Sequence, residues 1–182
     1  MRASSPLLLA VSGLPASGKT FLGSWLAREL QFPLVTKDEY KQILHEHLPD
    51  LSRAQSGPLS FAVMWQVADV ILRSGGSLVL ESHFYRPVSE THILELARAH
   101  GARLAQVYCE APLAELKRRH AGRVASGQRP YIDFPFDHET LPDSACWHPL
   151  MLNAPLLRLD TTVPDSLHSA LAWTRQQKGE TP

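Results

Sequence analysis

The sequence predicts an α/β protein in which a five-stranded parallel sheet lies between two layers of helices, a three-layer α/β/α fold. Two observations carry this prediction. Short apolar runs alternate with helix-like stretches along the chain, an order that parallel sheets with right-handed crossovers produce. The first apolar run also leads directly into a glycine-rich turn followed by a helix. A chain of 182 residues has the length of one such unit, so residues 1–182 are predicted to form a single domain.

The individual elements follow from apolar spacing and from the turn residues that flank it. Strands are expected at Leu7–Ser12, Leu34–Thr36, Ser77–Glu81, Arg103–Cys109 and Leu156–Asp160. Helices are expected at Phe21–Leu30, Asp38–Leu48, Pro58–Arg73, Val88–His100, Pro112–Arg123 and Pro164–Gln177. Two stretches are expected to lack regular structure, Pro49–Gly57 and Val124–Pro149.

The turn after the first strand matches the phosphate-binding pattern G-x-x-x-x-G-K-[ST]. It consists of Gly13, Leu14, Pro15, Ala16, Ser17, Gly18, Lys19 and Thr20. The glycines let successive N–H groups point at a phosphate, and the helix N-terminus adds positive charge. Lys19 is then placed to reach the β- and γ-phosphates, while the Thr20 hydroxyl suits Mg²⁺. The strand before the turn and the helix after it are the setting this motif requires, so we expect the chain to bind ATP with Mg²⁺.

Asp38 follows the second expected strand, and ligands of parallel sheets gather at the carboxyl ends of strands. The local sequence allows two roles for this residue. An aspartate at the start of a helix commonly caps it. It can also be the general base that deprotonates an acceptor hydroxyl for attack on a γ-phosphate. Its place at a strand end beside the phosphate loop favours the second role.

Glu81 ends the third expected strand. A carboxylate directly after an apolar strand suits Mg²⁺ binding through water, so Thr20 and Glu81 form the predicted metal site. The alternative is a charged residue that simply leaves the sheet at its end. The loop that follows, residues 82–87, is expected to be exposed.

A basic run follows the fourth expected strand and contains Lys117, Arg118, Arg119, Arg123 and Arg129 with no acidic residue among them. Such a run is usually a solvated face. Here it precedes a long segment with glycines and a proline, as in a mobile flap, where arginines would neutralise charge on a transferring phosphoryl group. The sequence therefore favours a short lid and acceptor region at about residues 119–150, with Arg123 as a catalytic residue.

Composition narrows the choice of partner. Eighteen basic and eighteen acidic residues give a formal net charge of zero, which provides no overall attraction to nucleic acid or to a membrane. A small molecule is therefore favoured over nucleic acid, and no membrane is expected. Cys109 and Cys146 form neither a metal-type spacing nor a disulfide framework, which fits a reducing cytoplasm. The nine histidines also lack metal-type spacing and are expected to be solvated or hydrogen-bonded locally.

These pieces together resemble the phosphate-loop kinases of the adenylate-kinase-like fold. The likeness is strongest to the branch that contains polynucleotide 5′-hydroxyl kinase domains, zeta toxins and chloramphenicol phosphotransferase. Besides the phosphate loop, it is carried by Lys37-Asp38-Glu39-Tyr40, the strand ending in Glu81, the R-x-x-G-R string Arg119–Arg123, and Leu159-Asp160-Thr161.

The resemblance implies a P-loop NTPase fold with strand order 2-3-1-4-5. It also implies that Asp38 is the base, that Arg119 lies near the adenine, that Thr161 precedes the adenine-contacting loop, and that Arg123 touches phosphates. Residues 132–149 match no part of the family pattern and are expected to hold acceptor specificity.

The expected activity is therefore an ATP-dependent kinase that phosphorylates a hydroxyl group of a small molecule. A phosphate acceptor is disfavoured because the charge of Asp38 would repel it, whereas an alcohol needs a base at that place. Two alternatives stay open: a polynucleotide 5′-hydroxyl kinase, and a non-kinase ATP-binding module of regulatory or toxin type.

Overall fold

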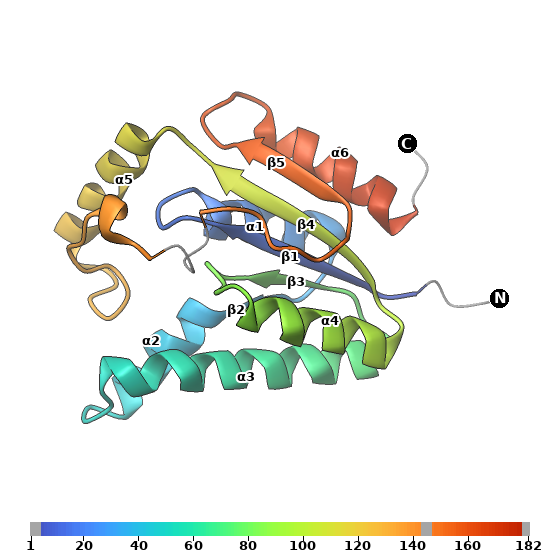
Figure 1. Cartoon of the computed structure of the whole chain (residues 1–182), viewed down its shortest axis with the longest axis horizontal. Coiled ribbons are helices and arrows are strands. Elements are labelled where there is room, and N and C mark those ends of the chain that lie inside the picture. The colour runs from blue at the N-terminus through green and yellow to red at the C-terminus, as the bar shows by residue number, and fades with distance from the viewer. Residues whose placement is uncertain (1–4, 143–146, 180–182) are drawn as a thin grey trace.

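The computed structural model describes residues 5–142 and 147–179 and confirms the three predicted layers (Figure 1). All strand pairs are parallel, and the order across the sheet is β2-β3-β1-β4-β5, as the family resemblance implied. The strands are β1 (Leu7–Gly13), β2 (Leu34–Thr36), β3 (Leu78–Glu81), β4 (Arg103–Glu110) and β5 (Leu156–Asp160). Cys146 and its neighbours at 143–145 lie outside the described residues.

The helices are α1 (Lys19–Leu30), α2 (Lys37–His47), α3 (Arg53–Arg73), α4 (Val88–His100), α5 (Leu113–Ser126) and α6 (Ser166–Lys178). A short 3-10 helix at His138–Thr140 lies inside the stretch that was expected to be irregular. The expected end of α5 at Arg123 was wrong, because the helix continues to Ser126 and stops at Gly127, whose φ is 62°.

Strand β1 is buried along its whole length because helices cover both faces of the sheet at its centre. Side chains alternate across a strand, so β1 contributes to two separate cores. Leu9 and Val11 pack with residues of α1 and α6. Leu8 and Ala10 pack with residues of α3 and α4. The two layers of helices are therefore anchored to the strand that leads into the phosphate loop.

The carboxyl ends of the strands meet at one edge of the sheet, on the left in Figure 1, where the phosphate loop and α5 also lie. The parallel register sets Val11 opposite Glu81 and Gly13 opposite Cys109. Glu81 thus lies beside the phosphate loop although the two are far apart in sequence. This edge is where ligands of parallel sheets bind.

The predicted start of α3 at Pro58 was wrong, because the helix begins at Arg53. Ser52 and Gln55 form a capping box: the Ser52 hydroxyl accepts from the Gln55 N–H at 3.3 Å, and the Gln55 side chain accepts from the Ser52 N–H at 3.2 Å. Pro58 lies inside the helix with its side chain exposed. The capping box therefore adds more than a turn to α3 at the edge where ligands bind.

Two further local predictions need correction. Thr36 is the N-cap of α2, while Asp38 lies in the first turn and accepts no capping bond, so the capping interpretation of Asp38 was wrong. The loop at 82–87 is only partly exposed, because Ser82 and Phe84 are buried. Both corrections concern residues at the carboxyl ends of the strands, where ligands of parallel sheets bind.

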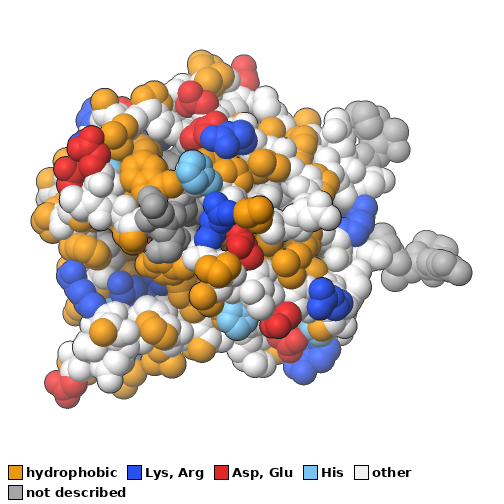
Figure 2. Space-filling view, in the orientation of Figure 1, with side chains coloured by type: hydrophobic (Ala, Val, Ile, Leu, Met, Phe, Trp, Pro, Cys, Tyr) orange, Lys and Arg blue, Asp and Glu red, His pale blue; other side chains and the backbone are white. Residues whose placement is uncertain are grey.

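The surface agrees with the balanced composition. Acidic and basic side chains are interspersed on the face shown in Figure 2, with no extended field of one sign. Within the described ranges, no helix combines the length and the apolar character that a membrane span requires.

Candidate active site

The phosphate loop has the backbone geometry that its glycines predict. Gly13 and Gly18 have φ values of 143° and 88°, a region that side chains with a Cβ rarely adopt. A Cβ on Gly13 would collide with the carbonyl oxygen of Cys109, and one on Gly18 would lie 3.3 Å from Thr161. Gly18 is also the N-cap of α1, so the loop ends where the N–H groups of that helix begin.

A second segment holds this loop in place. His138, in the 3-10 helix, is buried, and its Nε2 lies 3.1 Å from the carbonyl oxygen of Pro15. Since a carbonyl only accepts, the Nε2–H of His138 donates this bond. The bond braces a loop in which Ala16 has a φ of 66°, a strained value for a residue with a side chain. Sequence reasoning missed His138, because nothing near it in the chain connects it to the phosphate loop.

Lys19 is buried, and its ammonium donates to the carbonyl oxygen of Leu14 at 3.3 Å. The loop is closed further by the Ser17 N–H, which donates to the same oxygen at 3.1 Å. The head of Lys19 is therefore folded back over the loop at the point where a β- or γ-phosphate would lie.

Two adjacent hollows flank the N-terminus of α1 on the side of α5 and the β5 end, with volumes of about 520 and 570 Å³. Gly18, Phe21 and Arg119 line both of them. Phe21 is 69% exposed and forms a wall of these hollows. The two hollows therefore share a wall at the N-terminus of α1.

Arg119 and Thr161 lie together beside the phosphate loop. The Arg119 guanidinium donates to the Thr161 hydroxyl at 3.0 Å, and that hydroxyl donates to the carbonyl oxygen of Ser17 at 2.8 Å. Glu115 accepts from the other side of Arg119 at 2.7 Å. This chain of bonds ties α5 and the loop after β5 to the phosphate loop.

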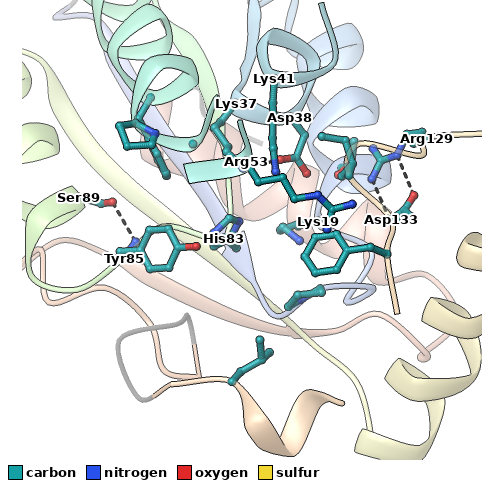
Figure 3. Close-up of a pocket in the computed structure, with 18 of the residues that line it drawn as sticks. Lys19, Lys37, Asp38, Lys41, Arg53, His83, Tyr85, Ser89, Arg129 and Asp133 are labelled. Carbon is teal, nitrogen blue, oxygen red and sulfur yellow. Dashed lines mark hydrogen bonds and ion pairs between the residues drawn. The ribbon is translucent and has the colours of Figure 1, made fainter. Parts of the chain in front are cut away.

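A larger cavity of about 990 Å³ opens on the other side of the loop, and Lys19, Thr20, Asp38 and Arg123 all line it. Asp38 pairs with the buried Lys37 at 2.9 Å. Burial acts to raise the pKa of Asp38, but the charges of Lys37 and Lys19 outweigh it and hold the pKa well below its usual range. The carboxylate is therefore ionised throughout the neutral pH range and faces the cavity (Figure 3).

Glu81 lies beneath this cavity and is fully buried. It accepts from the Thr36 hydroxyl at 2.7 Å. Burial raises the pKa of Glu81, while Lys19 and hydrogen bonds from Thr36 and Thr20 act in the opposite direction. Thr20 and Glu81 therefore offer neighbouring hard oxygen donors that fit Mg²⁺, which usually keeps several waters and phosphate oxygens as ligands. No group of three or more metal-binding side chains occurs in the described part of the chain, so phosphates and water would complete the shell.

The basic run divides into two parts. Lys117 and Arg118 are exposed and pair with nearby carboxylates, as a solvated face would. Arg123 and Arg129 instead line the cavity, and both approach Asp133, at 3.6 and 3.0 Å. The Asp133 side chain is 7% exposed, and Figure 3 shows its pairing with Arg129 beside the cavity. Sequence reasoning did not single out Asp133.

His83 is a further cavity residue that the sequence did not reveal. Burial, together with the charge of Lys37, lowers the pKa of His83 to about 3, so the ring is neutral. It stands edge-on to Tyr85 at 4.7 Å and near Phe61 at 6.3 Å, measured between ring centroids. A loop that was expected to be exposed therefore forms an aromatic wall next to Asp38.

Comparison with known proteins places this fold in a family. The family model described as AAA domain matches residues 8–138, well over half of the chain. The chain belongs to the AAA domain family. Among curated proteins, none matched. The matched range of this AAA domain protein runs from β1 through the phosphate loop to His138 and so contains most of the candidate site.

Solved structures agree on the fold. A candidate kinase from Chloroflexus aurantiacus is 30% identical with a TM-score of 0.84, covering 95% of this chain and 98% of its own. The APS kinase CysC of Mycobacterium tuberculosis, solved with AMPPNP and APS, is 19% identical with a TM-score of 0.65, and the coverage is 95% and 97%. Kti12 of Chaetomium thermophilum, solved with ADP-AlF3, is 16% identical with a TM-score of 0.67, and the coverage is 93% and 98%. The fold is that of the P-loop kinases.

Proposed function

We propose that this protein is an ATP-dependent phosphotransferase that moves the γ-phosphate of ATP to a hydroxyl group of a small molecule. One observation carries the proposal: Lys19 of the phosphate loop and Asp38 of α2 line the same cavity. A phosphate held at Lys19 and a hydroxyl held at Asp38 would face each other across that space. The candidate kinase and the APS kinase support phosphoryl transfer as the reaction class.

The N–H groups at the start of α1 and the ammonium of Lys19 would bind the β- and γ-phosphates. Phe21, Arg119 and Thr161 would hold the base and ribose side in the two flanking hollows. Thr20 would bind Mg²⁺ directly and Glu81 through water, and the ion would neutralise charge on the phosphates.

Asp38 would accept the hydrogen bond of the attacking hydroxyl and later its proton. Because Lys37 holds the pKa of Asp38 low, this carboxylate is a weak base toward a free alcohol. The transition state of phosphoryl transfer is loose, however, and the hydroxyl becomes acidic only as its oxygen bonds to phosphorus. Asp38 therefore acts first by orienting the nucleophile and receives the proton late in the reaction.

Arg123 and Arg129 would face the transferring phosphoryl group from the lid. Their positive charges oppose the negative charge on its equatorial oxygens, and such donors act strongly where water is excluded. Asp133 keeps both guanidinium groups oriented toward the cavity. The two arginines would thus supply positive charge to the transferring phosphoryl group.

The test is a transfer assay in which γ-labelled ATP is offered with nucleosides, sugars, sugar acids, antibiotics and 5′-hydroxyl oligonucleotides. We expect the label to move to at least one hydroxyl compound, and Lys19→Ala to abolish the transfer while thermal unfolding stays unchanged. Lys19 is chosen because it neutralises phosphate charge and does not belong to either hydrophobic core. Near-normal transfer by the folded Lys19→Ala protein would refute the phosphate-loop assignment.

A further inference from the structure

The wall of the large cavity formed by α2 and α3 carries cations that have no carboxylate partner among the described residues. Lys41, one turn after Lys37 on α2, is 9% exposed and takes part in none of the hydrogen bonds or ion pairs found there. Burial, together with the charges of Lys37 and Arg53, lowers the pKa of Lys41, and the charge of Asp38 opposes this only in part. A buried cation is costly unless an opposite charge accompanies it.

Arg53 is the second cation without a carboxylate partner in the described chain, although as a residue it is exposed to solvent. It is the first residue of α3, where the helix dipole disfavours positive charge. Its guanidinium lies over the ring of Phe134 at 4.3 Å from the centroid, inside the cavity and with no carboxylate partner in the described chain. In Figure 3 the side chains of Lys41 and Arg53 point toward the hollow that Asp38 also faces.

The charge of the cavity as a whole is strongly positive, although that of the protein is zero. Six cations line it: Lys19, Lys37, Lys41, Arg53, Arg123 and Arg129. Its two lining carboxylates, Asp38 and Asp133, are each already paired with one of these cations. One phosphate chain held at Lys19 and the lid would satisfy part of this excess and leave Lys41 and Arg53 unmatched.

The rest of this wall is flat and apolar. Phe61 and Trp65 of α3 stack with centroids 5.8 Å apart, and Tyr85 stands edge-on to Phe61 at 6.0 Å. All three line the cavity together with Phe134. Such faces suit a flat ring, and a volume of about 990 Å³ accommodates a molecule of nucleotide size.

Building on the proposed function, we infer that the acceptor is a small organic anion that carries both a flat ring and the reacting hydroxyl. Its anionic group, a phosphate or a carboxylate, lies between Lys41 and Arg53, and its ring packs against Phe61 and Trp65. The hydroxyl then reaches Asp38. Cationic acceptors such as aminoglycosides are disfavoured, because they would add charge to an already positive cavity.

Binding is measured first, with the nucleotide side saturated by AMPPNP and Mg²⁺, by isothermal calorimetry. In each of two pairs an anion is compared with an uncharged analogue. Adenosine 3′-monophosphate is compared with adenosine, which lacks the phosphate group, and 4-(hydroxymethyl)benzoate with the nearly isosteric 4-(hydroxymethyl)benzamide. We expect each anion to bind about tenfold or more tightly than its neutral partner, the scale of a charge-assisted hydrogen bond. Comparison of the two pairs distinguishes a phosphate from a carboxylate as the preferred group.

The variants are Lys41→Gln, Arg53→Gln and, as a conservative change, Lys41→Arg. We expect each Gln variant to lose the preference for the anion, and Lys41→Arg to restore most of it. Arg98→Gln on α4 is the matched control, since Arg98 is an exposed cation that does not line the cavity. Thermal unfolding of every variant confirms that the fold is intact.

Equal binding of anions and neutral partners, or a preference that survives both Gln variants, would overturn this inference. So would 5′-hydroxyl oligonucleotides binding more tightly than the mononucleotide, which would point to a nucleic-acid strand. Because AMPPNP transfers no phosphate, these outcomes do not depend on turnover. An anion preference that depends on Lys41 and Arg53 without transfer from ATP would support the anion site and count against the proposed function alone.

Discussion

The nucleotide side and the acceptor side of this site are built in different ways. On the proposed nucleotide side, one unbroken string from Gly13 to Thr20 supplies the loop, whose backbone N–H groups would contact the phosphates. On the acceptor side, the cavity is lined by side chains from α2, α3, the loop after β3 and the region after α5. The phosphate loop is defined by backbone conformation at a fixed spacing of residues, whereas the large cavity depends on how separate elements pack together.

This difference explains why the two sides are unequally visible in a sequence. Backbone geometry leaves a pattern, since Gly13 and Gly18 are required by their φ values and by the close approach of Cys109 and Thr161. The lining of the large cavity leaves no such sequence pattern, because several residue types can occupy each position and their spacing depends only on the lengths of the elements. Under the proposed function, the nucleotide side would set the reaction class and the acceptor side would select the substrate.

Asp38→Asn tests the link between the two sides and should have the largest effect on the acceptor side. If Asp38 orients the hydroxyl and takes its proton, transfer should fall by about two to four orders of magnitude. AMPPNP binding should persist, since residues 13–20 are untouched. Steady-state transfer rates and nucleotide titrations on the same preparation measure the two quantities.

The same variant leaves the buried Lys37 without its carboxylate partner, so the free energy of unfolding should drop by about 1–3 kcal/mol. Chemical denaturation quantifies that loss, and the transfer rate is compared well below the unfolding midpoint. A fully active Asp38→Asn protein would remove Asp38 from the mechanism.

Arg123→Ala tests whether an arginine of the lid contributes to phosphoryl transfer. Loss of one charged donor to a transferring phosphoryl group costs about 1.5–3 kcal/mol, so the single-turnover rate should fall by about ten- to a hundredfold. Nucleotide affinity should change less. Lys117→Ala is the matched control on the same helix, because Lys117 pairs with Glu139 at 3.1 Å and lines none of the three cavities described above. Equal rates for the two variants would show that the lid arginine has no part in the transfer.

Sequence reasoning found the phosphate loop of the proposed nucleotide side. Among the other residues that line the large cavity, it assigned roles only to Asp38 and Arg123. The strand order agrees with what the family resemblance implied. Most helices agree with the apolar spacing, since parallel strands need a crossover, usually a helix, between them. The start of α3 was misplaced, because Pro58 was taken for the first helical residue while Ser52 and Gln55 already formed a capping box. As a result Arg53 seemed to lie in a polar connection, and its place in the cavity was missed.

His83 allows the acceptor wall to be followed by pH. Its pKa is about 3 in the folded protein against 6.5 in an unperturbed histidine, so only the unfolded chain takes up this proton between those values. Stability should therefore fall as the pH drops from 6.5, by up to about 1.4 kcal/mol per pH unit.

His83→Gln should flatten that slope between about pH 4.5 and 6, measured by chemical denaturation at each pH. His45 and His120, whose pKa values burial also lowers, are present in both proteins, so the difference in slope isolates His83. If stability changes with pH equally in the two proteins, the His83 ring takes up its proton in the folded protein as readily as in the unfolded chain.

Gly122→Ala sharpens the comparison from the opposite direction, with the smallest expected effect. Gly122 is the glycine of the R-x-x-G-R string, yet it lies exposed within α5, and a Cβ there would meet nothing within 4 Å. Unlike Gly13, it has no backbone conformation that requires glycine, so alanine should stabilise the helix by about 0.5–1 kcal/mol.

Because Gly122 lines the hollow beside Lys19 and Arg123, the nucleotide affinity of this variant also tests whether a phosphate approaches α5. If the AMPPNP affinity is unchanged and the unfolding temperature rises, the helix tolerates a side chain at this position and no phosphate contacts Gly122. Weaker binding in a more stable protein would instead show that a phosphate approaches the α5 backbone, and would assign this part of the lid to the nucleotide side.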